Sequence, residues 1–299
     1  MTAHTPSRSR QASSKQVLRR PESQRRRMRD LLVLVPTFVV MAVIVFPVLW
    51  MVLSSMRPSS QLTSQLSWSS LFDGVSFDAY QRLFATSSFG TYLRNSLIVS
   101  SISTVLTVLI SSFAGYALSR YAFKGRAVLL LLILATQLLP FVVLVTPLYL
   151  AFSELRLVNS YPGLVLVYVA MTLPLAIYLM TGYFNTIPRV LDEAARIDGC
   201  STIDIVFKVI VPVAVPGIVT VAITAFIATW EEFLFASVLM TTDKLKTVQV
   251  GVAGFFGEYS TDWSLVMAAS TVAAVPTILL FFFVQKRLVS GMSAGSVKE

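Results

Sequence analysis

The segment Glu193-Ala-Ala-Arg-Ile-Asp-Gly199, followed by Pro212 and Pro216, decides how this chain can fold. It lies in a charged stretch, roughly residues 184–212, that has long apolar runs on both sides. Such a stretch is expected to connect two membrane spans outside the hydrocarbon. Its pattern of alanine, glycine and proline indicates a folded connection rather than a simple linker.

A short helix is predicted over residues 188–198, because at 100° per residue this stretch separates an apolar arc from a polar arc. The apolar arc contains Val190, Leu191, Ala194, Ala195 and Ile197, and the polar arc contains Arg189, Asp192, Glu193 and Arg196. Pro188 suits a first helical position, and Gly199 suits the left-handed residue that ends a helix. Ser201 and Asp204 then predict the capping box of a second short helix. The small alanines would let a partner's surface approach the backbone closely.

This segment resembles the EAA loop in the membrane subunits of bacterial ABC importers. The residues that match at the expected spacing are Glu193, Ala194, Ala195, Asp198, Gly199, Phe207, Ile210, Pro212 and Pro216. In that family the loop is the coupling helix, which docks in a cleft of a separate ATPase subunit. The resemblance therefore implies an ATPase-coupling role for Glu193, Ala194, Ala195, Asp198 and Gly199. The alternative is an ordinary amphipathic loop between two spans.

The composition is that of an integral membrane protein. Of the 299 residues, 55% are hydrophobic and 13% are charged, and the mean hydropathy is +0.74, which is too apolar for a soluble domain. The net charge of +9 is concentrated before the first apolar run, so membrane orientation explains it better than nucleic-acid binding does. With His4 and Cys200 as the only residues of their types, no internal disulfide, catalytic residue or metal site is expected.

The chain has no G-x-x-x-x-G-K-[ST] sequence, so it cannot supply a P-loop of its own. We expect no cofactor in this chain. The resemblance implies that ATP and Mg²⁺ are bound by a partner ATPase subunit, and that this chain is a permease subunit rather than an enzyme.

Six membrane-spanning helices are predicted, because charge-free windows of about 20 residues or more recur along the chain. The windows are residues 31–56, 95–119, 127–153, 157–188, 209–230 and 263–285. The fifth helix is expected to continue past two carboxylates to Met240. The predicted fold is therefore an all-α polytopic membrane protein, and the resemblance implies the transmembrane domain of a type I ABC importer with a cytoplasmic coupling helix.

The domain organisation follows from the same windows. Residues 1–30 are predicted to form a disordered basic tail, because they are polar and rich in serine, glutamine and arginine. They are not predicted to be part of a signal peptide, because the apolar run that follows is too long for a signal-peptide core. Residues 31–289 are predicted to form the permease domain, with the coupling loop at 184–215. Residues 290–299 are predicted to form a second tail. Of the 24 lysines and arginines, 18 fall in the segments that are inside if the amino terminus is inside. Both tails and the coupling loop are therefore predicted to be cytoplasmic, in a bacterial inner membrane.

Glu231 and Glu232 are unusual because they follow an apolar span directly. A carboxylate near the centre of a membrane helix costs roughly 2.5 to 3.5 kcal/mol, so this pair needs water, partners or protonation. Adjacent helix positions diverge by 100°, so both side chains cannot point the same way. The pair either lines a substrate path or makes a polar contact at a subunit interface or near the outer headgroups. Trp230 could offer an aromatic face to a sugar ring, and Gln137 is a weaker polar candidate within a span.

The run Trp230-Glu-Glu-Phe-Leu-Phe-Ala236 is similar to a run in carbohydrate-type permease subunits, the branch that includes the maltose permeases. This chain has Glu231 where that branch usually has asparagine. The likeness covers roughly residues 30–298. It implies a sugar or oligosaccharide substrate, a second permease subunit, a cytosolic ATPase dimer and an external solute-binding protein.

Three alternatives stay open from the sequence. The substrate could be another small polar solute, such as glycerol phosphate. The chain could also be a membrane-embedded enzyme that uses Glu231 and Glu232, although no histidine, aspartate or serine constellation accompanies them at membrane depth. A structural or signalling membrane protein is the third alternative, and the coupling motif argues against it.

Overall fold

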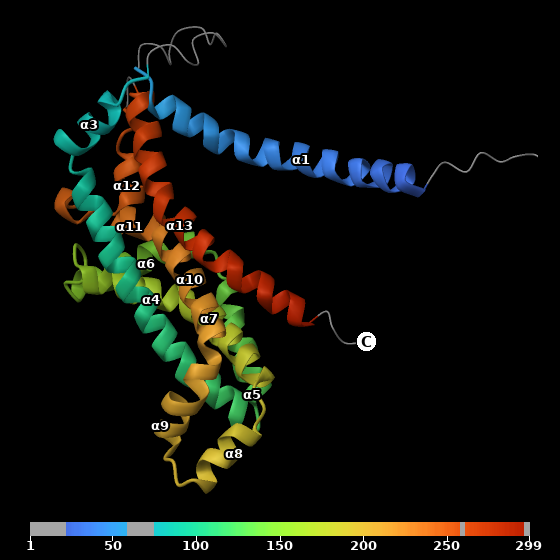
Figure 1. Cartoon of the computed structure of the whole chain (residues 1–299). Helices are drawn as coiled ribbons and strands as arrows, with labels where there is room; N and C mark the ends of the chain where they lie inside the picture. The colour runs from blue at the N-terminus through green and yellow to red at the C-terminus, as the bar shows by residue number, and fades with distance from the viewer. Residues whose placement is uncertain (1–21, 59–74, 258–260, 296–299) are drawn as a thin grey trace, which may run out of the picture. The chain divides into compact units, whose positions relative to one another are not determined.

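The computed structural model describes residues 22–58, 75–257 and 261–295, and these are folded into helices joined by turns, without a β-strand in those ranges (Figure 1). Residues 1–50 and residues 51–299 form two compact units, which are described separately. Five helices are long and apolar enough to cross a membrane, and a sharply bent helix pair makes a sixth crossing if it is counted as one span. The predicted all-α polytopic fold is confirmed.

The first span is part of α1 (Glu22–Ser55), whose apolar stretch runs over Leu32–Ser55. The helix begins inside the segment 1–30, where disorder was expected, because residues 22–30 are mostly glutamine, arginine and other good helix formers. The basic stretch before the span is therefore helical from residue 22 onward. Residues 1–21 of the predicted tail lie outside the described part of the chain.

The chain from residue 51 onward is built on three long helices, α4 (Phe89–Arg120), α7 (Tyr161–Thr186) and α10 (Val211–Trp230). α4 packs along α7, and α10 packs against both. The contact between α4 and α7 is close because Gly115 has no side chain: a Cβ atom there would lie 2.7 Å from the Cβ atom of Met180. The hydroxyl groups of Thr107 and Thr172 share a 2.8 Å hydrogen bond across the same contact.

The third predicted span is not one helix, contrary to expectation. It consists of α5 (Arg126–Ala135), the short 3₁₀ helix η2 (Thr136–Leu138) and α6 (Phe141–Glu154). The two halves meet at an angle of 91°. Pro140 lies at the break in an extended conformation, and its ring cannot supply the backbone N–H that a continuous helix needs. Residues on both sides of the bend line a cavity beside α7, which is described below.

The fifth predicted span is also interrupted, so the expected continuation to Met240 is wrong. α10 ends at Trp230, and a separate short helix, α11 (Leu234–Leu239), follows. The Glu232 carboxylate accepts hydrogen bonds from the backbone N–H groups of Phe235 (2.7 Å) and Ala236 (3.0 Å). These groups have no partner within a new helix, so a carboxylate at this position favours a helix start here over continuation of α10.

The remaining elements are α3 (Asp78–Ala85), the 3₁₀ helix η4 (Asp243–Leu245), α12 (Val248–Ala253) and α13 (Trp263–Gly295). The buried Asn95 side chain joins η4 to α4, because its amide donates to the carbonyls of Lys244 and Lys246, both at 2.9 Å. Beside it, the Tyr92 hydroxyl and then Lys246 hold the pKa of Asp243 below its usual value. α13 extends to residue 295, so the start of the predicted tail 290–299 is helical, and residues 296–299 lie outside the described part.

Candidate functional site

The loop singled out by the sequence folds as predicted in its local details. α8 (Val190–Ile197) begins two residues after Pro188, and Gly199 takes the predicted left-handed conformation, with φ of +82°. Ser201 caps α9 (Thr202–Asp204) by accepting a hydrogen bond from the Asp204 N–H at 3.2 Å, as a capping box requires. A six-residue π-helix, η3 (Ile205–Ile210), then leads into α10.

The whole loop lies at one end of α4 and α7, away from α3 and α12 (Figure 1). The π-helix is a rare element that is frequently found at functional sites. It makes the connection between the loop and the fifth span different from an ordinary helix.

α8 turns most of its apolar arc away from the rest of the protein. Within this helix, the buried side chains are those of Asp192 and Ala195, each 5% exposed. The other apolar residues point outward, and Ile197 is 85% exposed. We define the exposed face of α8 as Val190, Leu191, Ala194 and Ile197. An apolar face held away from the protein's own core is typical of an interaction surface.

Four of the five predicted coupling residues lie at the surface and one does not. Glu193, Ala194, Asp198 and Gly199 are exposed. Ala195 instead packs in a hydrophobic cluster with Ile205 and Ile210, so the expectation that its small side chain admits a partner's surface is wrong. It admits the protein's own core instead.

The inward face of α8 carries a buried polar cluster that the sequence did not reveal. The Asp192 carboxylate lies 3.0 Å from Arg120 Nε of α4, and both side chains are nearly inaccessible. The Tyr116 hydroxyl donates to the same carboxylate at 2.7 Å. Asp192 belongs to the polar arc that periodicity predicts for α8, and the structure buries it. Its partners are more than 70 residues earlier in the chain, so no local signal identifies them.

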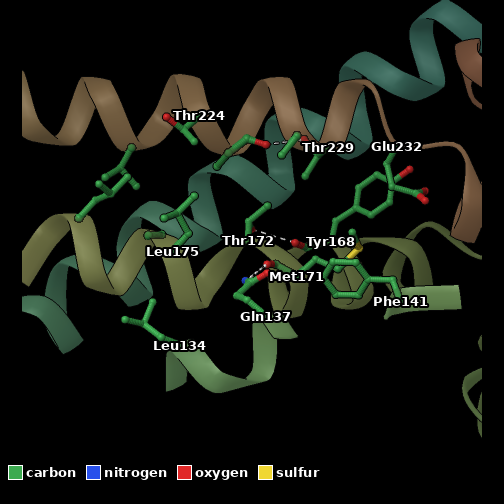
Figure 2. Close-up of a pocket in the computed structure, with 15 residues that line it drawn as sticks. Leu134, Gln137, Phe141, Tyr168, Met171, Thr172, Leu175, Thr224, Thr229 and Glu232 are labelled. Carbon is green, nitrogen blue, oxygen red and sulfur yellow. Dashed lines mark hydrogen bonds between the residues drawn. The ribbon is translucent and has the colours of Figure 1, made fainter. Parts of the chain in front are cut away.

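A cavity of about 430 Å³ lies between the bent pair α5–α6, α7 and α10. It brings together Gln137 and Glu232, two of the four residues predicted for a substrate path, although they are far apart in the sequence (Figure 2). Its lining is mostly apolar, with polar groups from Gln137, Tyr168, Thr172, Thr224, Thr229 and Glu232, and it contains no lysine or arginine. Such a surface can pack against the apolar face of a sugar ring and hydrogen-bond its hydroxyl groups.

The polar groups of the cavity are partly engaged by the protein itself. The Gln137 amide donates to the Met171 carbonyl at 2.9 Å, and the Glu232 carboxylate, 9% exposed, caps α11. Tyr168 lies beside Glu232 at the same end of the cavity, but its hydroxyl makes no hydrogen bond of ordinary geometry (Figure 2).

The other two predicted path residues lie elsewhere. Trp230 is 1% exposed, stacks on Phe226 and donates from its indole N–H to the Ala273 carbonyl at 3.0 Å. It therefore joins α10 to α13 and offers no free face to a sugar. Glu231 is exposed and is not part of the cavity lining. One of the two adjacent carboxylates is therefore exposed and the other is buried, and both lie in the break between α10 and α11 rather than within a helix.

Comparison with known proteins places these features in a family. Residues 107–294 match the family described as the binding-protein-dependent transport system inner membrane component. The chain is 37% identical over 254 residues to the sulfoquinovosyl glycerol transport system permease protein SmoH of Agrobacterium fabrum, covering 85% of this chain and 88% of that protein. It is 35% identical over 276 residues to the trehalose/maltose transport system permease protein MalG of Thermococcus litoralis, covering 91% and 98%.

The fold also resembles that of a solved structure. A chain from the crystal structure of a bacterial ABC transporter involved in the import of the acidic polysaccharide alginate superposes with a TM-score of 0.74 at 22% identity. The match covers 87% of this chain and 96% of that chain.

Proposed function

The chain belongs to the family of binding-protein-dependent transport system inner membrane components, and from this premise we propose that it forms half of the solute path of an ATP-driven sugar importer. The other half comes from a second, similar permease subunit. The substrate is a sugar or oligosaccharide delivered by an external solute-binding protein. The chain is a permease subunit and not an enzyme.

The outward-facing apolar residues of α8 are the observation that carries the coupling role. α8 exposes Val190, Leu191 and Ile197 at one end of the bundle. An apolar helix face of this kind can bind in a hydrophobic groove of a partner protein. In this proposal the groove belongs to a cytosolic ATPase dimer, which binds ATP and Mg²⁺ and moves α8 as the dimer closes. Movement of α8 then changes which side of the membrane the path opens to.

The substrate class is supported by the relatives and by the cavity. Both relatives carry sugar derivatives in their names, sulfoquinovosyl glycerol in one case and trehalose or maltose in the other. The cavity between α5–α6, α7 and α10 combines apolar surfaces with hydroxyl and amide groups, which suits a neutral sugar ring. An anionic group, whether the phosphate of glycerol phosphate or the sulfonate of sulfoquinovosyl glycerol, fits this lining less well than a neutral sugar, because it would meet Glu232 and no lysine or arginine.

We place both termini and the α8 end of the bundle in the cytoplasm. Basic side chains gather at the α8 end of the bundle, because Arg120 and Arg126 both reach the end of α7 there. Cysteine labelling tests this orientation in a Cys200→Ser chain. A membrane-impermeant maleimide added to spheroplasts should label Phe84→Cys on α3 and spare Ile197→Cys on α8; the reverse result would invert the topology.

The function itself is tested on the complete complex. The permease pair, the ATPase and the binding protein are reconstituted in liposomes, and ATP hydrolysis is measured with a panel of trehalose, maltose, sulfoquinovosyl glycerol and glycerol phosphate. Stimulation and uptake by at least one sugar are the expected result. Stimulation by glycerol phosphate alone, or by none of the panel, would refute the carbohydrate assignment.

A further inference from the structure

The buried cluster of Asp192, Arg120 and Tyr116 is the charged connection between α8 and the helix bundle. α8 has eight residues, and those buried are Asp192 and Ala195. Ala195 contributes a single methyl group to its contact, whereas Asp192 makes directional polar contacts. Within α8, Asp192 therefore carries the polar contact to α4, beside the residue that precedes the helix, Arg189, which donates to the Ser119 carbonyl at 3.1 Å.

Three helices meet at this cluster. One oxygen of Asp192 accepts from the Tyr116 hydroxyl at 2.7 Å, and the other lies 3.0 Å from Arg120 Nε. Arg120 also donates from Nη1 to the carbonyls of Phe184 and Ile187, at 3.2 and 3.1 Å, where α7 ends. Tyr116 and Arg120 are one helical turn apart on α4, so they act from the same face. The cluster joins α8 to the ends of both α4 and α7.

Stabilisation alone is a poor explanation for this ion pair. Removing two charges from water costs energy that their attraction often does not recover, and apolar residues of similar volume can stabilise a core equally well. The pair also lacks some of its hydrogen bonds. Asp192 Oδ2 and Arg120 Nε approach without hydrogen-bond geometry, and Arg120 Nη2 is buried without an acceptor. A spare buried donor allows the carboxylate to pair differently when α8 shifts.

A continuous set of contacts leads from this cluster to the cavity. Arg120 and Tyr116 belong to α4, and α4 also carries Thr107, which is hydrogen-bonded at 2.8 Å to Thr172 of α7. Thr172 lines the cavity. A shift or rotation of α4 therefore reaches the cavity lining through the hydrogen bond between Thr107 and Thr172.

We propose that Asp192 and Arg120 are positioning residues that transmit movement of α8 to α4 and so keep ATP hydrolysis coupled to sugar transport. This inference rests on the function proposed above. The cluster acts only through α8 and α4 and touches neither ATP nor the sugar. Without its charge pair, α8 would still bind the ATPase, because the exposed face of α8 is unchanged, but its movement would no longer be followed by α4.

The test compares Asp192→Asn with the wild-type complex in liposomes, using the panel sugar that stimulates the wild type most. We expect the ATPase to bind normally and hydrolyse ATP, while the number of ATP molecules used per sugar transported rises at least tenfold. Lys208→Gln is the matched control, because it removes an exposed ion pair with Asp204 from the same loop, and its ratio should not change. An unchanged ratio in Asp192→Asn would overturn the inference.

Two further measurements cover the other outcomes. If Asp192→Asn fails to assemble, Tyr116→Phe removes a single hydrogen bond and should raise the ratio two- to fivefold; an unchanged ratio would overturn the inference. Maleimide labelling of Thr224→Cys in a Cys200→Ser chain reports on the cavity without any sugar. Labelling should respond to ATP in the wild-type background and not with Asp192→Asn, and an equal response would refute the transmission. A wild-type complex that responds to no sugar refutes the proposed function instead.

Discussion

Replacing Ala195 with leucine tests which face of α8 looks inward. The Ala195 side chain is 5% exposed and packs in a cluster with Ile205 and Ile210, both fully buried. A leucine side chain is three carbon atoms larger, and these atoms must displace the neighbours or rotate α8. Overpacking of this kind costs roughly 1 to 3 kcal/mol. The permease should therefore lose stability on its own, before any ATPase is present.

Ala194→Leu is the matched control, because it adds the same atoms to the residue that precedes Ala195. Ala194 is exposed, so the added side chain has room, and the stability of the isolated permease should change by less than about 0.5 kcal/mol. The larger side chain instead alters the exposed face of α8. We therefore expect Ala194→Leu to weaken ATPase binding while leaving the permease intact.

Both effects are measurable on purified protein in detergent. Thermal unfolding, followed by size-exclusion chromatography after heating, reports the stability of the permease, and pull-down with the ATPase reports docking. The expected pattern is a lower unfolding temperature for Ala195→Leu and weaker pull-down for Ala194→Leu. The opposite pattern would show that Ala195 faces the partner and that the orientation of α8 described above is wrong.

Three other substitutions follow from the same structure. Gly199→Val should weaken ATPase association through backbone strain of roughly 1 to 2 kcal/mol alone, since φ is +82° and no atom lies within 4 Å of an added Cβ; normal uptake and pull-down would contradict this. Gly115→Ala should cost roughly 1 to 3 kcal/mol in thermal unfolding by separating α4 from α7, whereas Gly182→Ala, which has open space, should be neutral or stabilising. Glu232→Gln replaces one of the two oxygens that accept from the Phe235 and Ala236 N–H groups with an N–H donor. The free energy of unfolding of the permease should therefore fall by roughly 1 to 3 kcal/mol, and less complex should assemble. Equal stability of Glu232→Gln and the exposed control Glu231→Gln would remove the capping role.

Much of the fold could be predicted because its signals are local or compositional. Apolar windows long enough to cross a bilayer identify spans wherever they occur, since lipid requires every backbone group to be satisfied within a helix. The left-handed Gly199 and the Ser201 cap follow from the chemistry of single residues and their nearest neighbours. The membership in the importer family likewise rests on a contiguous motif. These features needed no knowledge of the rest of the chain.

The breaks in the third and fifth spans were within reach of the sequence but were outweighed by hydropathy. Pro140 marks the 91° bend, and Glu232 marks the start of α11. Each residue signals a helix boundary, yet apolar residues on both sides also fit a single long span. Whether such a residue bends, kinks or ends a helix depends on what the neighbouring helices offer to the freed backbone groups.

The sequence by itself determined that this chain is a multi-span permease with a folded loop between its fourth and fifth predicted spans, whereas the tertiary structure alone decided which residues face one another. Periodicity separated an apolar arc from a polar arc on α8 without saying which one faces the bundle, and α8 turns Asp192 inward because Arg120 and Tyr116 of α4 meet its charge there. Gln137 and Glu232 share a cavity only because the bend after α5 and the end of α10 bring them together. Contacts between residues distant in the chain depend on helix packing, which local sequence patterns do not specify.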